Sequence, residues 1–239
     1  MFYGFDPLYW IVIGTGMVLS LWAQARVKGT FHKYSQIGTQ SRMTGAQVAG
    51  NILLQNNIRD VKIEPVAGSM TDHYDPRTMT LKLSEPVYGS NSMAALGVAA
   101  HEVGHAIQHA SGYVPLKFRS AWVPVANLGG GISMIVIILA FLMGGAATLL
   151  GQNLAIVGVI LFATTTLFTL VTLPVEFDAS RRALLALESG GYVSSAELQG
   201  ARKVLNAAAL TYVAAFVTSL LTLLYWAHRL GLLGGGRRD

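Results

Sequence analysis

The chain has 239 residues, of which 52% are hydrophobic and only 12% are charged, and its mean hydropathy is +0.48. This composition excludes an ordinary soluble domain and indicates a membrane protein. The formal net charge of +5 comes from basic residues scattered around the ends of apolar runs, so we expect no nucleic-acid partner. The chain contains no cysteine, which excludes disulfides, cysteine-peptidase chemistry and cysteine-ligated zinc.

Apolar runs long enough to cross a hydrocarbon core of about 30 Å occur in four places. They cover approximately residues 7–25, 121–143, 153–173 and 207–227, and none of them contains Lys, Arg, Asp or Glu. Tryptophans lie near the ends of these runs, as in the aromatic belts of membrane proteins. We therefore predict about four transmembrane helices and, as one partner, the lipid bilayer.

The first run ends in Ala23-Gln24-Ala25, which resembles a signal-peptidase site. A cleavable signal normally begins with a basic segment, whereas residues 1–7 contain no Lys or Arg and include Asp6. We expect this helix to be retained.

Charge in the short loops predicts the orientation, because cytoplasmic loops are enriched in Lys and Arg. Basic residues follow the first run, precede the second and lie between the third and fourth: Arg26, Lys28, Lys33, Arg42, Lys117, Arg119, Arg181, Arg182, Arg202 and Lys203. These segments should face the cytoplasm. Arg229, Arg237 and Arg238, after the fourth run, argue for the opposite orientation.

Residues 26–120 are mostly polar and should contain the catalytic portion. Thr44 can cap an amphipathic helix that ends near 56–57, and the alternation over 61–65 predicts a short strand. Turn residues at 74–77 between alternating segments predict a β-hairpin. The fold class expected is a mainly α membrane protein with a small α+β, zincin-like portion.

A further helix, capped by Asn91 or Ser92 and ending near Ser111, should carry His101-Glu102-Val103-Gly104-His105. Its histidines are four residues apart, so both imidazoles lie on one helix face and can bind one Zn²⁺. Glu102 is rotated by about 100° from His101, which suits a general base better than a ligand. The same motif can also arise by chance in a helix.

A catalytic zinc usually has three protein ligands. The metzincin extension is absent, because Gln108 and Ser111 occupy the positions of its Gly and His. His109 is two turns from His101 and is interpreted as a surface or supporting residue. Glu176, after the third run, is the preferred third ligand, although it could instead pair with Arg181 or Arg182, and Asp178 ranks second.

Three stretches resemble those of a known family: TDHYDPRTMTLKLSEPVY, AALGVAAHEVGHAIQHA and LPVEFDASRRAL. In order and spacing they are similar to the bacterial YugP-type neutral zinc metallopeptidases, which are related in pattern to HtpX and the CAAX prenyl proteases. The resemblance covers most of the chain. It implies that His101, His105 and Glu176 bind zinc and that Glu102 is general base and acid.

HtpX-like enzymes commonly have an aspartate four residues after the ligand glutamate, where this chain has Ser180. Asp72, Asp75 or Asp178 could instead hold the second nitrogen of a histidine ligand. His73 and Tyr74 are candidates for the donor to a reaction oxyanion, or they simply build the hairpin turn. The hairpin could also offer an edge strand to an extended substrate.

The predicted organisation is 1–25, first transmembrane helix; 26–120, catalytic portion; 121–173, second and third transmembrane helices; 174–206, the segment with the third ligand; and 207–239, fourth helix and basic tail. The predicted activity is peptide-bond hydrolysis in proteins or peptides, membrane proteins included, by a multi-pass protein of the bacterial cell membrane. Two rivals remain: a site-2-type intramembrane protease, and a non-enzymatic scaffold with structural zinc. The oligomeric state is left open.

Overall fold

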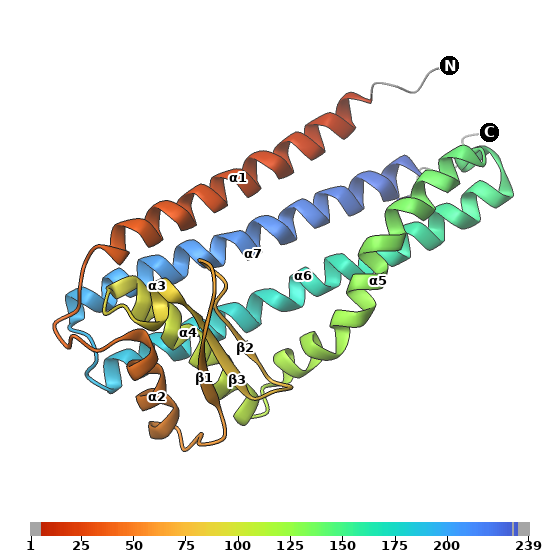
Figure 1. Ribbon diagram of the computed structural model, residues 1–239. Helices are drawn as coiled ribbons and strands as arrows, with labels where there is room; N and C mark the ends of the chain where they lie inside the picture. Colours follow the sequence, from red (N-terminus) through yellow and green to blue (C-terminus); the bar gives the residue numbers. More distant parts are fainter. Residues whose placement is uncertain (1–5, 231, 234–239) are drawn as a thin grey trace. The chain divides into compact units, whose positions relative to one another are not determined.

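A computed structural model describes residues 6–230, 232 and 233, so the predicted roles of Arg237 and Arg238 fall outside the described residues. Figure 1 shows the elements in chain order: α1 (Pro7–Ser35), α2 (Gly45–Gln55), β1 (Lys62–Val66), β2 (His73–Asp75), β3 (Thr80–Ser84), α3 (Glu85–Tyr88), α4 (Met93–Ala110), α5 (Val114–Leu142), a 3₁₀ turn (Gly145–Ala147), α6 (Leu149–Ser189) and α7 (Ser195–Arg229). The predicted fold class, mainly α with four candidate spans and a small sheet, is confirmed.

The chain forms two compact units. Within the described residues, the first unit comprises the beginning of α1, most of α5, the first part of α6 and the second part of α7. The second unit comprises 23–117 and 173–211.

The first unit is built from helices long and apolar enough to cross a membrane. In an apolar 18-residue stretch of each candidate spanning helix, only 11% to 28% is buried within the protein. Large apolar side chains such as Ile11, Val18 and Ile135 are therefore exposed. Such a surface would be unfavourable in water and is suited to lipid.

Side-chain hydrogen bonds connect helices within the first unit. The indole Nε1 of Trp122 donates to the carbonyl of Thr164 at 3.1 Å, and the hydroxyls of Thr166 and Ser219 lie 2.8 Å apart. Hydrogen bonds of this kind connect transmembrane helices, where apolar side chains gain little by leaving lipid.

The second unit contains the sheet, whose strand order is β1-β3-β2. β1 runs parallel to β3, while β2 and β3 form the predicted antiparallel hairpin. The helix α2 begins with a capping box in which the Thr44 side chain accepts from the backbone of Gln47 and the Gln47 side chain accepts from the backbone of Thr44. The side chain of Ser92 caps α4 by accepting from Ala95.

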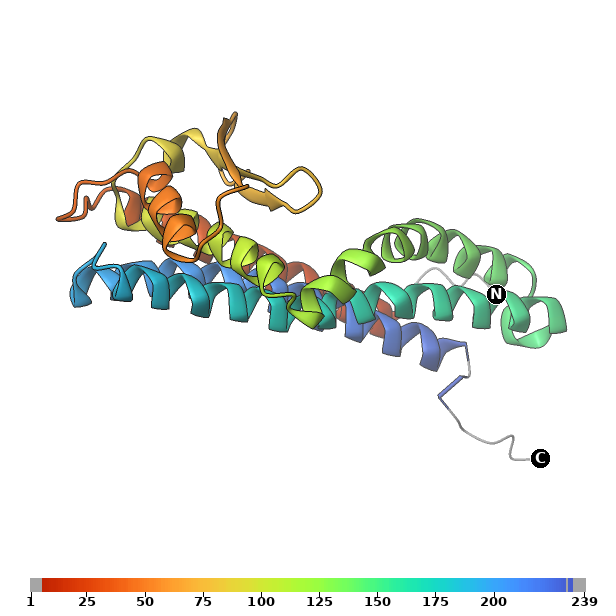
Figure 2. The ribbon, with the colours of Figure 1, turned by 90° about the horizontal axis from the view of Figure 1, so that it is seen from below.

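The core of the second unit surrounds α4. Figure 2 shows α2 and the sheet on one side of α4, with α6 and α7 on the other. Fully buried side chains from these layers meet in one cluster that includes Ile52, Leu81, Leu96, Val103 and Leu187. Because both sides of α4 are covered, a polar side chain on it is held in a defined place.

The helices α6 and α7 extend well beyond the apolar runs from which they were predicted. Residues 174–189 continue α6 without a break, even though Pro174 lies inside the helix, and residues 195–206 begin α7. The apolar runs end near charged residues, so hydropathy alone does not include the residues beyond them. Those residues still include strong helix formers such as Ala, Leu and Arg, and the helices continue through them. Glu176 is therefore carried by the same helix as the third predicted span.

Candidate metal centre

The imidazoles of His101 and His105 lie together on one face of α4. Their ring centroids are 4.8 Å apart and the rings are nearly perpendicular, at 83°. His105 is buried and His101 is partly buried. The four-residue spacing thus produces the predicted pairing of the two rings.

Glu176 approaches this pair from α6. Its Oε2 lies 3.2 Å from Nε2 of His101 and 3.6 Å from Nε2 of His105. One potential ligand atom from each of the three residues lies within 4.8 Å of the others. The structure therefore brings together the three residues predicted as ligands.

Close packing of two helix backbones makes this approach possible. A Cβ added at Gly104 would lie 3.0 Å from the carbonyl carbon of Ala179 and would meet its oxygen more closely still. Only glycine lets α4 and α6 come this near at that point. Glu176 precedes Ala179 by about one turn and so reaches the histidines.

The chemistry of the three donors fits zinc. Two imidazole nitrogens and one carboxylate oxygen form the His₂Glu set found in catalytic zinc sites. Glu176 is only 2% exposed, and an ionised carboxylate at that depth requires positive charge nearby. Burial opposes the charged form of His105, but Glu176 and Glu102 together raise the pKa of His105 above its ordinary value.

The second nitrogen of each histidine also has a partner. Nδ1 of His101 lies 3.1 Å from the Ser180 hydroxyl, and Nδ1 of His105 lies 3.0 Å from Oε1 of Gln108. Such partners fix which ring nitrogen carries the proton and direct the other toward a metal. Both Nε2 atoms face Glu176.

Gln108 connects the site to Asp178, one of the carboxylates that the sequence offers as a direct partner of a histidine. Its amide nitrogen donates to the carbonyl of Val175 at 2.8 Å and to Oδ2 of Asp178 at 3.0 Å. Asp178 in turn pairs with Arg181 and Arg182. Asp178 therefore contacts His105 through Gln108, a residue whose position in the sequence indicates only a departure from the metzincin pattern.

Glu102 is buried beside the pair, with 8% of its surface exposed. None of the described residues gives its carboxylate a hydrogen bond or an ion pair. A buried carboxylate without such a partner retains its capacity to accept a proton from a small molecule such as water.

Tyr74 and His73 lie on β2 and make contacts other than with the three grouped side chains. The Tyr74 hydroxyl lies 2.9 Å from Nδ1 of His109 on α4, and burial, together with Asp60 and Asp75, raises the pKa of Tyr74 to about 12. The hydroxyl therefore stays protonated at physiological pH. The exposed ring of His73 bonds the carbonyl of Thr71 at 2.8 Å.

Asp72 and Asp75 stabilise the hairpin. Asp72 accepts from the backbone amide and hydroxyl of Ser84, while Asp75 accepts from the backbone amide of Arg77. The predicted alternative in which either holds a histidine nitrogen is not what the structure shows, because Gln108 and Ser180 occupy that role. Both carboxylates instead form hydrogen bonds close to the hairpin.

Comparison with known proteins gives two matches of wide extent. The family model described as "Putative neutral zinc metallopeptidase" matches residues 9–230. The "Putative membrane protease YugP" of Bacillus subtilis (strain 168) is 47% identical over 206 residues, which cover 86% of this chain and 89% of that protein. No solved structure matches the chain.

Proposed function

Since the chain belongs to this family of neutral zinc metallopeptidases, we propose that it is a membrane-embedded zinc peptidase that cleaves peptide bonds in proteins or peptides. The observation that carries the proposal is the convergence of His101, His105 and Glu176 from two helices. These three residues would hold the Zn²⁺. The proposed protein or peptide substrates include other membrane proteins.

When bound, the zinc ion would supply a Lewis acid that polarises a peptide carbonyl and makes water a stronger nucleophile at neutral pH. Glu102 accepts the proton of the attacking water and delivers it to the leaving amine. Ser180 and Gln108 hold the histidine rings in the required orientation throughout.

The edge strand β2 supports a peptide as substrate. It is the outer strand of the sheet on the hairpin side, and it packs against α4. An extended peptide that pairs with the free edge of β2 would be held mainly by backbone hydrogen bonds. Few side chains of the substrate would then determine specificity.

The setting of α4 favours this reading over a site-2-type intramembrane protease. Such enzymes carry the motif within a spanning helix, whereas α4, with 18 residues, is not among the described helices that are apolar enough to span. It lies inside the core of the second unit. We propose that this unit faces the cytoplasm, because basic residues surround the span ends that adjoin it.

The first test separates binding of metal from turnover. In detergent-purified protein, Glu102→Gln should retain about one zinc per chain by elemental analysis and lose hydrolysis of casein by at least about a hundredfold, since general acid–base catalysis contributes 10² to 10⁴. Glu188→Gln, an exposed change on α6, is the matched control. Undiminished proteolysis by Glu102→Gln would overturn the assignment.

The second test addresses the ligands. His101→Ala and Glu176→Ala should each lose zinc, whereas Glu188→Ala should keep it. A Glu176→Ala variant that keeps its full zinc content would place the third ligand elsewhere. Wild-type protein that holds zinc but hydrolyses neither casein nor membrane-protein substrates would favour a scaffold with structural zinc.

A further inference from the structure

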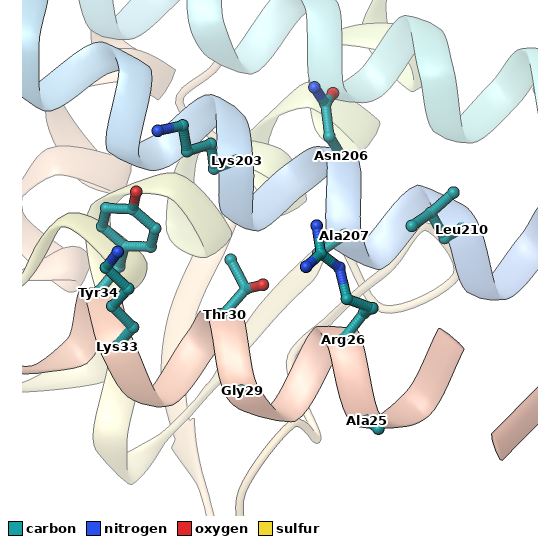
Figure 3. Close-up of a pocket in the computed structure, with 10 residues that line it drawn as sticks. All are labelled: Ala25, Arg26, Gly29, Thr30, Lys33, Tyr34, Lys203, Asn206, Ala207 and Leu210. Carbon is teal, nitrogen blue, oxygen red and sulfur yellow. The ribbon is translucent and has the colours of Figure 1, made fainter. Parts of the chain in front are cut away.

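A groove separates α1 from α7 within the second unit, and its lining residues include none of His101, His105 and Glu176. Its volume is about 620 Å³, and Figure 3 shows the residues that line it. Arg26, Thr30 and Lys33 project from α1, while Lys203 and Asn206 come from α7. The proposed peptidase mechanism uses none of these side chains.

The groove is strongly cationic. Arg26, Lys33 and Lys203 line it, and none of the described residues that line it is acidic. Within the described part of the chain, no carboxylate forms an ion pair with any of the three. Like charges that share one concave surface repel one another, so a bound anion would stabilise the arrangement.

Hydrogen-bond donors complete the lining. The Thr30 hydroxyl and the Asn206 amide lie beside the cations, and the ammonium of Lys33 lies 5.6 Å from the centre of the Tyr34 ring. A phosphate group, with several acceptor oxygens, matches such a set of charged and neutral donors.

The position of the groove along both helices indicates where its ligand comes from. Arg26 directly follows the first apolar run, which ends at Ala25, and Asn206 directly precedes the fourth, which begins at Ala207. Both helices thus change from apolar to basic at the groove. Ala25, Ala207 and Leu210 supply its apolar lining. Arg26 lies beside Ala207, while Lys33 and Lys203 lie toward the polar ends of the two helices (Figure 3).

We infer that this groove binds the phosphate of an anionic phospholipid headgroup, whose acyl chains follow the apolar runs. Basic pockets between helices at the cytoplasmic side of a membrane recognise headgroups in this manner. A soluble phosphate would gain nothing from the apolar lining. The inference does not depend on the proposed peptidase activity.

Gly29 lines the groove without contributing a side chain to it. A Cβ added at this position would meet no heavy atom within 4 Å, and the residue lines the groove. Glycine inside a helix costs about 1 kcal/mol relative to alanine. A larger side chain at Gly29 would therefore strengthen the helix while it fills the space proposed for the headgroup.

The test is native mass spectrometry of the full-length protein in detergent, titrated with phosphatidylglycerol or phosphatidylcholine. Wild type should bind phosphatidylglycerol with an apparent Kd at least about tenfold lower than that for phosphatidylcholine. Lys33→Gln combined with Lys203→Gln should weaken binding of phosphatidylglycerol by about tenfold or more. Equal binding of the two lipids by wild type would overturn the inference.

Two controls distinguish the groove from general surface charge. Lys28→Gln combined with Arg202→Gln removes the same charge from neighbouring exposed positions outside the groove, and its affinity should equal that of wild type. Gly29→Leu keeps every charge and should lose the preference for phosphatidylglycerol. Equal weakening by both double variants, or full binding by Gly29→Leu, would contradict a groove site.

Competition identifies the source of the phosphate. Excess glycerol 3-phosphate should leave bound phosphatidylglycerol largely in place, because it lacks acyl chains. Complete displacement by glycerol 3-phosphate would show that the groove binds a soluble anion instead of a lipid. Complete displacement by an oligoglutamate peptide would show that it binds an acidic peptide. The zinc content should be the same in all groove variants, so this test can fail while the proposed metal site stands.

Discussion

The neutral side chain of Gln108 holds Nδ1 of His105, a role for which the sequence predicts a carboxylate. It is fully buried and joins Nδ1 of His105 to Asp178 and to the backbone of α6. Nδ1 of His101, by contrast, faces the Ser180 hydroxyl, which has no carboxylate partner among the described residues. The two histidines are therefore supported unequally.

Replacing Gln108 by Leu should weaken zinc binding by about ten- to a hundredfold, because partners of ligating histidines typically contribute this much. The change also leaves the Val175 carbonyl without this donor, which should cost about 1–3 kcal/mol of stability. Zinc competition with a chromogenic chelator measures the first effect. Gln55→Leu, on the exposed side of α2, should leave the affinity unchanged, and equal affinities in both variants would show that Gln108 does not support His105.

Tyr74 is the better placed of the two predicted oxyanion donors, because its hydroxyl faces α4 while His73 is exposed. If it donates to the reaction oxyanion, Tyr74→Phe should lower kcat by about a hundredfold, in line with loss of one such donor. KM and zinc content should change little. Tyr88→Phe on α3 is the control, and an unchanged kcat in Tyr74→Phe would restrict Tyr74 to the structural contact with His109.

The grouping of the two histidines could be predicted from their spacing, because residues four apart on a helix share a face. The sequence favours Glu176 among several acids but leaves alternatives, since nothing in the sequence shows which helix packs against α4. The role of Gln108 could not be predicted, because a neutral amide is neither a charged residue nor a typical metal ligand. Its one signal is position, three residues after His105 on the same helix face.

Among the elements, the contact between α4 and α6 determines how closely Glu176 approaches His101 and His105. Gly104→Ala would place its Cβ against the Ala179 backbone, which can yield only if the helices separate. We expect a stability loss of about 1–3 kcal/mol from this overpacking, together with loss of zinc, because Glu176 moves away from the histidines.

A matched change lies on the same helix. At Gly97 the nearest atom to an added Cβ is the Ala201 side chain, at 3.3 Å, so Gly97→Ala should be tolerated and retain zinc. Thermal unfolding in the presence of a chelator separates the packing effect from metal loss. Similar zinc contents in both variants would show that the approach of α4 to α6 does not determine the site.

Elements with capping residues were predicted to within about two residues: α2 between Thr44 and Asn56, and α4 between Ser92 and Ser111. The hairpin was likewise indicated by its turn residues. The long helices were found but their ends were not, because α6 and α7 leave the apolar region and continue as amphipathic helices. Hydropathy reports where a helix can meet lipid, not where it stops.

For the whole molecule, the distribution of Lys and Arg predicts which loops share a side of the membrane. The absence of cysteine makes this testable with single substitutions in an otherwise unreactive chain. A cysteine at Ser194, between α6 and α7, should react with an impermeant maleimide only after cells are opened, and one at Gly145, between α5 and α6, should react in intact cells. The reverse pattern would place the proposed peptidase site outside the cytoplasm.

Because the chain is synthesised from its N-terminus, the separation of the proposed ligands along the sequence affects when the site can form. Glu176 follows His101 by 75 residues, and the second and third predicted spans lie between them. On the proposed ligand set, a nascent chain that has just emerged with both histidines still lacks its carboxylate. The site can close around a metal only after two further segments have entered the bilayer, so the growing polypeptide cannot become an active peptidase before its membrane insertion is nearly complete.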